Sequence, residues 1–247
     1  MTDAGQPVLV RRFAAGVRIA SLPLMMVVEE IEVYRDAGTS AHDFVVLQNQ
    51  FASTSGRVAF AKEFAHGLVS GSKGTLKVAR TEVSAPVTLD AASTRLAVTF
   101  ETNRGRLPMA VDLVQVDRVL TAVFVVGLFG QKLTGSDAAH VAAAAEARLK
   151  AAFTVSSAQA PTVAGQAQQG QTLTVDEGSW RGAPSIFSYA WARCDTTGST
   201  CTPVAGATDK TYTPTAADSG YTLRVTVTGA NTVGSQQANS ALTAAVP

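Results

Sequence analysis

The sequence predicts an α+β N-terminal half, in which two helices pack on an antiparallel sheet, followed by an all-β sandwich. Three observations predict this organisation. Strand-like runs rich in β-branched and aromatic residues dominate residues 8–129. Two segments with a helical spacing of apolar residues interrupt and follow these runs. After Phe153 the helical spacing disappears, and short alternating runs recur between Gly, Pro, Asp and Asn residues.

The first half contains several strand-like runs, most of them joined by short polar links. These runs are Val8 to Phe13, Leu24 to Tyr34, Phe44 to Gln48, Leu96 to Thr102, Met109 to Val116 and Val119 to Phe129. The NRG link at residues 103–105 tolerates a positive φ. We therefore expect an antiparallel hairpin between Leu96 to Thr102 and Leu107 to Val114. Residues 117 and 118 are expected to form the next turn.

Two segments are predicted to be helices. Ser55 to Ser70 follows polar residues that can cap its first turn, ends at Gly71, and has apolar residues at helical spacing at Phe60, Ala61, Phe64 and Leu68. Ser136 to Phe153 is rich in alanine, begins with a serine and an aspartate, and carries basic residues near its end. The order of strands, helix, meander and helix is typical of helices packed on an antiparallel sheet.

The chain divides where the sequence pattern changes. We expect an α+β domain over residues 8–153, a small polar linker over residues 154–160 and a β-sandwich domain over residues 161–247. The strand-like runs of the second domain are Gln171 to Val175, Phe187 to Cys194, Tyr221 to Thr228 and Ser235 to Val246. Short strands at such regular intervals predict a sandwich.

Composition narrows the classes of partner. The 20 basic and 19 acidic residues are well mixed and give a formal net charge of +1, so neither nucleic acid nor anionic lipid is favoured. The longest apolar run, Val119 to Phe129, is shorter than the ~20 residues of a membrane-spanning helix. The first residues, MTDAGQPVLVRR, lack the pattern of a secretory signal. We therefore expect either a cytosolic protein or a trimmed mature fragment.

Motifs in a fixed order carry a family resemblance in the second half. They are Pro161, Gly165, GQTLT at 170–174, GSW at 178–180, YAWARC at 189–194, Cys201, VAGAT at 204–208, TYTPTAADSG at 211–220, TLRVTVTGAN at 222–231 and GS at 234–235. The region from Pro161 to Val246 resembles the Ig-like repeat of surface and secreted proteins of actinobacteria and related bacteria. Strand alternation agrees with an inter-sheet core, because Tyr189 and Trp191 share one face. A second strand face is shared by Leu223, Val225 and Val227.

Both cysteines of the chain, Cys194 and Cys201, lie within the region of resemblance. In the bacterial repeat such a close pair closes one hairpin loop, so the resemblance implies a disulfide and an oxidising location. The alternatives are a reduced cytosolic pair, a metal site and a redox pair. The histidines all lie in the other domain, and the spacing is not C-x-x-C. A closed loop of about eight residues contributes roughly 2.5 kcal/mol, so we expect the sandwich to survive reduction.

A second resemblance lies in the first half, in VDRVLTAVFVVGLFGQKLTGSDAAHVAAAAEARL (Val116 to Leu149). A strand whose apolar residues end at Gly130 is followed by a short loop and by a helix that begins at Ser136. Together with the order of strands and helices, this segment is similar to a PsbP-like domain. That fold is shared by a photosystem-II extrinsic protein and by small exported actinobacterial lipoproteins. The resemblance implies a non-catalytic assembly factor or binding module.

Several stretches imitate catalytic motifs. Ser70 and Lys73 fit the S-x-x-K spacing, but this serine ends a helix and the K-T-G companion is missing. The stretch GLVSGSKGT at 67–75 follows a helix and lacks the Gly-Lys-Ser/Thr order of a phosphate-binding loop. We interpret it as an exposed loop.

Isolated polar residues have simple structural interpretations. The acidic stretch EEIE at 29–32 is interpreted as a solvated strand face. His66 and His140 have no Asp or Ser partner at local spacing and are interpreted as packed or surface residues. Asp218 and Gly220 are expected to form a capped turn before a core strand.

The first domain contains candidates for the lining of an apolar pocket. They are Met25, Met26, Phe60, Phe64 and Phe100. The alternative is that these side chains fill the core, as Met and Phe usually do. No residue set predicts a metal or a cofactor.

We therefore expect a non-catalytic exported or cell-surface bacterial protein. Its first domain would bind an unknown protein or a small apolar ligand of the cell envelope, and its second would space the first from the envelope or contribute an adhesive surface. The alternative is a hydrolase of envelope polymers with an accessory β-sandwich, which needs at least two acid–base groups in a cleft of the first domain. Glu30, Glu32 or Glu63 facing a histidine across a solvent-filled pocket would favour this alternative. A third hypothesis is an intracellular structural protein with reduced cysteines.

Overall fold

The computed structural model describes residues 7, 9–17, 25–69, 77–84, 89, 91–102, 104–127 and 133–247. The chain forms two compact units, Met1–Leu149 and Lys150–Pro247. The first unit combines helices with an antiparallel sheet and the second consists mainly of strands, so the predicted α+β class is confirmed. Within the described ranges, no helix has the length and apolar character needed to cross a membrane.

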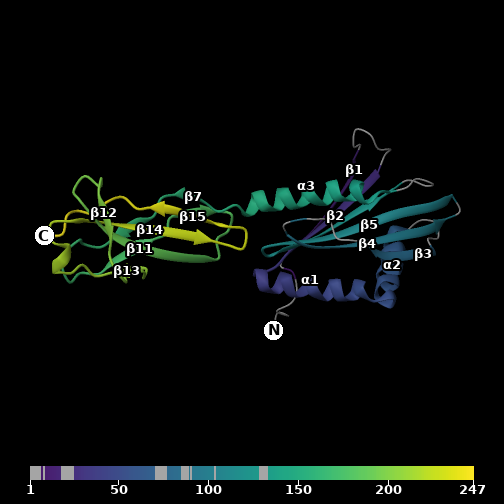
Figure 1. Cartoon of the computed structure of the whole chain (residues 1–247), viewed down its shortest axis with the longest axis horizontal. Coiled ribbons are helices and arrows are strands. Elements are labelled where there is room, and N and C mark those ends of the chain that lie inside the picture. The colour runs from purple at the N-terminus through teal and green to yellow at the C-terminus, as the bar shows by residue number, and fades with distance from the viewer. Residues whose placement is uncertain are drawn as a thin grey trace. The chain divides into compact units, whose positions relative to one another are not determined.

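The first unit is built on a six-stranded antiparallel sheet with the order β1-β2-β6-β5-β4-β3 (Figure 1). Its strands are β1 (Leu9–Val17), β2 (Met25–Val33), β3 (Lys77–Ser84), β4 (Ala92–Thr102), β5 (Gly105–Val116) and β6 (Val119–Val126). The predicted runs overlap every strand of this sheet except β3. Strand β3 lies at the sheet edge and has a register shift and several charged residues, so it lacks a clear apolar alternation.

The β4–β5 hairpin was predicted, and the structure confirms it. Thr102 pairs with Gly105, which has a φ of 111° that suits glycine and strains other residues. Thr102 Oγ1 accepts a hydrogen bond from Arg104 N at 3.0 Å and donates one to Gly105 O at 2.7 Å. The β5–β6 turn lies at the predicted position, where Asp117 has a φ of 52°. Both turns fix the register of the central strands.

Helix α1 (Ala37–Ala52) covers the segment Phe44 to Gln48, so the prediction of a strand there is wrong. Adjacent valines favoured a strand, but the apolar residues that pack on the sheet recur at helical spacing at Phe44, Leu47 and Phe51. Asp36 Oδ1 caps the helix by accepting a hydrogen bond from Thr39 N at 2.8 Å. Packing of this face outweighs the lower helix propensity of the valines. The described part of the first unit therefore contains three helices, where the sequence predicted two.

Helices α2 (Thr54–Val69) and α3 (Gly135–Phe153) confirm the two predicted helices to within one residue at each end. Helix α3 begins with a reciprocal cap. Asp137 Oδ2 accepts a hydrogen bond from Thr134 N at 3.0 Å, and Thr134 Oγ1 accepts one from Asp137 N at 3.3 Å. The capping residue is therefore Thr134, two residues before the predicted Ser136.

Helices cover both faces of the sheet, with α1 and α2 on one face and α3 on the other (Figure 1). The α1/α2 face has the larger core, with buried side chains that include Phe44, Phe51, Leu96, Phe100, Met109, Leu113 and Phe124. The α3 face is packed mainly by small side chains, namely Ala110, Val123, Val125, Ala138 and Ala145. Alternation along each strand separates the two sets, because successive side chains point to opposite faces.

The second unit contains two main sheets, with the orders β12-β11-β14-β15 and β13-β9-β8, and a strand pair β10-β7. The strands are β7 (Ser156–Gln159), β8 (Thr162–Ala164), β9 (Leu173–Asp176), β10 (Ser179–Arg181), β11 (Ile186–Cys194), β12 (Cys201–Pro203), β13 (Thr211–Tyr212), β14 (Thr222–Ala230) and β15 (Ser235–Asn239). The predicted run from Ser235 to Val246 is a strand only as far as Asn239. The other three predicted runs overlap β9, β11 and β14.

One hydrophobic core lies between the two main sheets. It consists of Leu173, Val175, Trp191, Leu223, Val225, Val227 and Val246. The predicted alternation along β14 is confirmed, because its three core residues are fully buried. Trp191 is also buried and donates its Nε1–H to Asp209 O at 3.1 Å. Tyr189, which was predicted to share a strand face with Trp191, is only half-buried and packs against this core.

Candidate functional site

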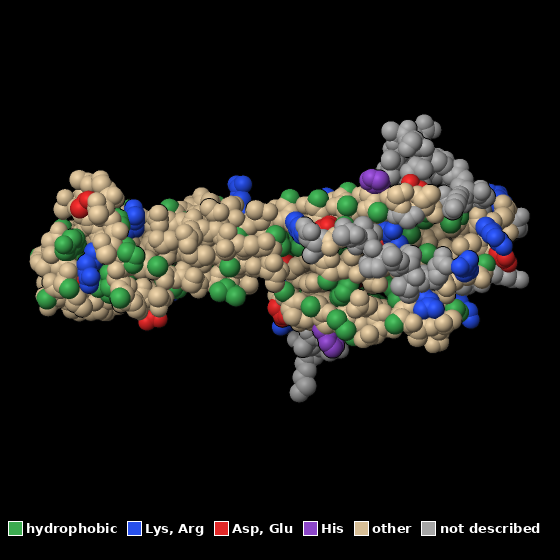
Figure 2. All heavy atoms as spheres, in the orientation of Figure 1, with side chains coloured by type: hydrophobic (Ala, Val, Ile, Leu, Met, Phe, Trp, Pro, Cys, Tyr) green, Lys and Arg blue, Asp and Glu red, His purple; other side chains and the backbone are tan. Residues whose placement is uncertain are grey.

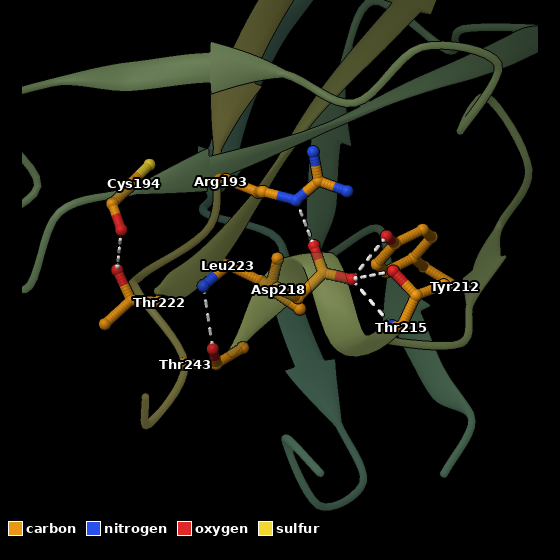
Figure 3. Close-up of polar contacts among 8 residues, drawn as sticks. All are labelled: Arg193, Cys194, Tyr212, Thr215, Asp218, Thr222, Leu223 and Thr243. Atoms are coloured by element: carbon orange, nitrogen blue, oxygen red, sulfur yellow. Dashed lines mark hydrogen bonds and ion pairs between the residues drawn. The ribbon is translucent and has the colours of Figure 1, made fainter. Parts of the chain in front are cut away.

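A densely connected polar cluster of the second unit surrounds Asp218 (Figure 3). Asp218 ends the short helix η1 (Ala216–Asp218), which leads into β14. Arg193 comes from β11 and Tyr212 from β13, so the cluster joins segments of both main sheets. Sequence reasoning placed Asp218 in a capped turn but did not find these two partners.

The Asp218 carboxylate is fully buried, and both of its oxygens accept hydrogen bonds. Oδ2 accepts from Thr215 N at 2.7 Å, from Thr215 Oγ1 at 3.0 Å and from the Tyr212 hydroxyl at 2.8 Å. Oδ1 accepts from Arg193 Nε, which forms an ion pair with it. The charge of the carboxylate is therefore compensated within the unit.

The pKa values of the three ionisable groups in this cluster are shifted away from neutral pH. Burial raises the pKa of Asp218, but the hydrogen bonds from Thr215, Tyr212 and Arg193 outweigh it, so the pKa lies below its ordinary value. Burial and the hydrogen bond to Asp218 raise the pKa of Tyr212. The hydrogen bond to Asp218 raises the pKa of Arg193. The three shifts favour the charged carboxylate, the charged guanidinium and the neutral hydroxyl, which are the forms that make these hydrogen bonds.

Cys194 and Cys201 form a disulfide, as predicted. They are directly opposite residues of the antiparallel β11–β12 pair, so the bond closes one hairpin within a single sheet. Cys194 is fully buried, and its carbonyl oxygen accepts a hydrogen bond from Thr222 Oγ1 at 3.2 Å. No cluster of candidate metal ligands exists in the described part of the chain.

The loop inside the disulfide is organised by Asp195. Its carboxylate accepts hydrogen bonds from the backbone N–H groups of Thr197, Ser199 and Thr200 at 2.9 to 3.0 Å. It also accepts one from Thr197 Oγ1 at 2.7 Å. The Thr197 hydroxyl and these N–H groups lower the pKa of Asp195 to about 2. The loop is therefore held by hydrogen bonds as well as by the disulfide.

A second polar cluster of this unit surrounds Glu177. Its carboxylate accepts hydrogen bonds from the Tyr189 hydroxyl at 2.5 Å and from Lys210 Nζ at 2.9 Å. Burial raises the pKa of Glu177, but the two hydrogen bonds outweigh it and lower the pKa overall. Burial and the contact with Glu177 raise the pKa of Tyr189 to about 12. Both shifts favour the ionised carboxylate and the neutral hydroxyl, which are the forms that make this hydrogen bond.

The surface of the second unit carries little charge. Its 98 residues, Lys150–Pro247, include five basic and five acidic residues. Figure 2 shows that the visible face around β11 and β14 is covered mainly by uncharged side chains. The formal charges of this unit therefore balance.

An ion pair lies buried on the α3 face of the first unit. Arg95 and Asp112 are opposite residues of β4 and β5, and both are almost fully buried. Arg95 Nε and Nη2 donate to Asp112 Oδ1 and Oδ2 at 2.5 and 2.8 Å. Burial raises the pKa of Asp112, although the hydrogen bond and charge of Arg95 oppose this effect. Sequence reasoning missed the pair, because each strand also carries a second charged residue, Glu101 in β4 and Arg106 in β5, and the pattern does not single out Arg95 and Asp112.

The predicted pocket residues fall into two groups. Phe100 is fully buried in the α1/α2 core, and Phe60 packs against this core with ring contacts to Phe51 and Phe124. Met25 and Met26 lie on β2 and Phe64 lies on α2, but their side chains lie outside the described residues. The two described phenylalanines thus fill the core, and the pocket stays a prediction.

The acidic stretch on β2 is not a fully solvated face. Glu29 pairs with Arg148 of α3, and its side chain is 15% exposed. Glu29 shares its strand face with Ile31 and Val33, and α3 covers this face at Glu29, whereas Glu30 and Glu32 share the other face. The opposite face carries Glu32, whose carboxylate accepts a hydrogen bond from the Tyr34 hydroxyl at 2.9 Å.

The other candidate residues are described only in part. His140 Nδ1 contacts Ser136 O at 2.8 Å, and His42 and Glu63 are exposed. Ser70 and Lys73 lie outside the described residues, as does the side chain of His66.

Comparisons with known proteins do not assign the chain to a family. No model of a known protein family matches the chain, and no curated protein matches it.

Proposed function

We propose that the chain is a non-catalytic binding protein of an oxidising compartment outside the bacterial cytoplasm. The observation that carries the proposal is the disulfide between Cys194 and Cys201. Disulfides persist in oxidising locations and are rare in the cytosol, where thiols are kept reduced. A structural disulfide without a metal cluster in the described residues fits a secreted or surface protein.

The second unit is proposed to be an Ig-like module that spaces or presents the first. Support comes from two antiparallel sheets around one core that includes Trp191. In antibody domains the disulfide bridges the two sheets, whereas here it lies within the β11–β12 hairpin. This location agrees with the short cysteine loop of the bacterial repeat.

The first unit is proposed to be a PsbP-like domain that binds a protein or a small apolar ligand of the cell envelope. Support comes from the antiparallel sheet covered by helices on both faces and from the strand and helix order that ends with α3. The buried ion pair of this unit fits a structural role, because Arg95 and Asp112 compensate each other's charge between two neighbouring strands.

A binding role is favoured over catalysis by the electrostatics of the described polar clusters. The carboxylates of Asp218 and Glu177 have lowered pKa values, and the hydroxyls of Tyr212 and Tyr189 have raised ones. A general acid or base needs a pKa near the working pH, whereas the pKa values of these four groups are shifted away from neutral pH. The clusters thus resemble structural networks.

The experiment that tests the proposal is a sedimentation assay of the full chain with an insoluble bacterial envelope fraction. We expect the chain to be retained in the pellet while no soluble polymer fragments are released. Heat-unfolded chain serves as the control for unspecific retention. Fragments that accumulate in proportion to the amount of chain would support the hydrolase instead. Equal retention of folded and unfolded chain would contradict a specific binding role.

A further inference from the structure

The loop between the two cysteines is organised around one side chain. Residues 195–200 connect β11 to β12, and Asp195 is the first of them. Its carboxylate accepts hydrogen bonds from the backbone N–H groups of Thr197, Ser199 and Thr200 at 2.9 to 3.0 Å. Half of the backbone N–H groups of this short loop therefore donate to a single carboxylate.

The backbone of Asp195 belongs to the same network. Asp195 N donates to Thr200 O at 2.9 Å, and Asp195 O accepts from Gly198 N at 3.0 Å. Thr222 Oγ1 of β14 donates to Cys194 O at 3.2 Å (Figure 3) and to Asp195 O at 3.0 Å, which anchors the loop to β14. None of these hydrogen bonds requires the two sulfur atoms to be joined.

The strand register sets the two cysteines opposite each other, but it offers little to hold them there. Cys194 and Cys201 are directly opposite residues of the β11–β12 pair. Strand β12 has three residues and lies at the edge of its sheet. Short edge segments with few contacts open most easily, so reduction of the disulfide would free β12 to separate from β11. The network around Asp195 opposes this separation, because it fixes the loop that joins the two strands.

We propose that Asp195 positions the two cysteine thiols of the reduced chain for disulfide formation. Its carboxylate fixes the loop, keeps Cys194 and Cys201 opposite each other, and so raises the effective concentration of one sulfur at the other. The same hydrogen bonds make the closed disulfide harder to open, because a displaced thiol stays close to the sulfur that it left. The inference rests on the geometry of the hairpin and does not depend on where the chain is located.

Oxidation by a small disulfide, such as glutathione disulfide, takes two exchange steps. Cys194 is fully buried and Cys201 is half-buried, so we expect the Cys201 thiolate to attack first, forming a mixed disulfide and releasing one glutathione. The Cys194 thiolate then attacks Cys201 Sγ and releases the second glutathione. In total the two cysteines lose two electrons and two protons, which the two glutathione molecules gain. Asp195 acts on the second step, which takes place within the hairpin.

The charge and the hydrogen bonds of Asp195 have opposite effects on oxidation. A negative charge beside Cys194 disfavours the thiolate and slows exchange, whereas the hydrogen bonds of the loop favour closure. Asp195→Ala removes both, so a fall in closure identifies the hydrogen bonds as the dominant effect. Asp195→Asn removes the charge but keeps Oδ1, which accepts from Thr197 N, Thr197 Oγ1 and Ser199 N. It loses only the hydrogen bond from Thr200 N to Oδ2.

Equilibration of the full chain with glutathione and glutathione disulfide tests the proposal, with acid quenching and intact mass spectrometry as the readout. At a fixed glutathione concentration, Asp195→Ala is expected to lower the ratio of closed disulfide to mixed disulfide by at least about tenfold, because all hydrogen bonds to the carboxylate are lost. Asp195→Asn is expected to keep a ratio closer to that of the unchanged chain. Both variants are expected to fold, since the loop lies outside the core between the two main sheets.

Asp176→Ala is the matched control. Asp176 is an exposed residue of β9 in the other main sheet, and its carboxylate accepts a hydrogen bond from Gly178 N at 2.8 Å. This variant should leave the ratio unchanged. An unchanged ratio in Asp195→Ala would overturn the proposal, because the strands alone would then hold the thiols together. An equal fall in Asp195→Ala and Asp176→Ala would overturn it as well, and neither failure would bear on the proposed location.

Discussion

Replacing Asp218 by alanine is expected to destabilise the second unit by about 3 kcal/mol, since it removes one partner of a buried ion pair. The substitution leaves Arg193 without its carboxylate and removes the acceptor of the Tyr212 and Thr215 hydrogen bonds. For a unit of this size, the loss corresponds to a fall in melting temperature of roughly 15 °C. Tryptophan fluorescence measures it selectively, because Trp180 and Trp191 are the two tryptophans of the chain.

An exposed aspartate of the same unit supplies the control. Asp209→Ala removes a carboxylate whose residue is exposed, so it is expected to change the stability by less than about 0.5 kcal/mol. Equal melting temperatures for Asp218→Ala and Asp209→Ala would mean that the Asp218 cluster does not stabilise the fold.

The pH dependence of the second unit follows from the same carboxylate. The pKa of Asp218 is lower in the folded state than its ordinary value. Its stabilising effect is therefore fully present above the ordinary carboxyl pKa and is lost as the pH falls through the lower folded value. Asp218→Asn should flatten the loss of stability in this acidic window.

Replacing Asp112 alone by leucine is expected to destabilise the first unit by about 3 to 5 kcal/mol, because the buried Arg95 loses its carboxylate. Replacing both residues, Arg95→Met with Asp112→Leu, is expected to recover most of this loss. A buried ion pair and a well-packed apolar pair are often of similar stability, since desolvation offsets the attraction. Helical circular dichroism follows this unit, which contains α1, α2 and most of α3.

An exposed pair on the same two strands provides a matched control. Glu101 and Arg106 are opposite residues of β4 and β5, and both are exposed. The double replacement and each single replacement of this pair are expected to change stability by less than about 1 kcal/mol. If Asp112→Leu and Glu101→Leu lowered the free energy of unfolding equally, the buried pair would not stabilise the first unit more than the exposed pair does.

The pKa of Asp112 gives the first unit the opposite pH dependence. Burial raises this pKa above its ordinary value. The contribution of Asp112 to stability is thus fully present below the ordinary carboxyl pKa and is lost as the pH rises through the raised folded value. The two buried carboxylates therefore affect their units in opposite directions as the solution is acidified.

The sequence predicted those parts of the fold that depend on local pattern. The alternation of Leu223, Val225 and Val227 and the spacing of Phe60, Ala61 and Phe64 each select one type of element. Prediction was wrong at Phe44 to Gln48, where adjacent valines suggested a strand. The outcome there depended on packing against a sheet whose other strands are distant in sequence.

The polar clusters were less predictable than the elements. Asp218 was expected in a capped turn, but its ion pair with Arg193 requires two strands to meet across a sandwich. Arg95 and Asp112 become partners only through the register of the β4–β5 hairpin, in which a shift by one residue would separate them. The disulfide was easier to predict from the sequence, because its two cysteines are close in sequence and lie in a region of family resemblance.

The most direct test of the proposed location is the redox state of the cysteines in the native chain. Cells that produce the chain are lysed in excess N-ethylmaleimide, and the chain is then analysed by intact mass spectrometry without reductant. We predict no adduct, because Cys194 and Cys201 are joined in the disulfide before lysis. A chain that carries two adducts would contradict the account, since it would place the protein in a reducing compartment.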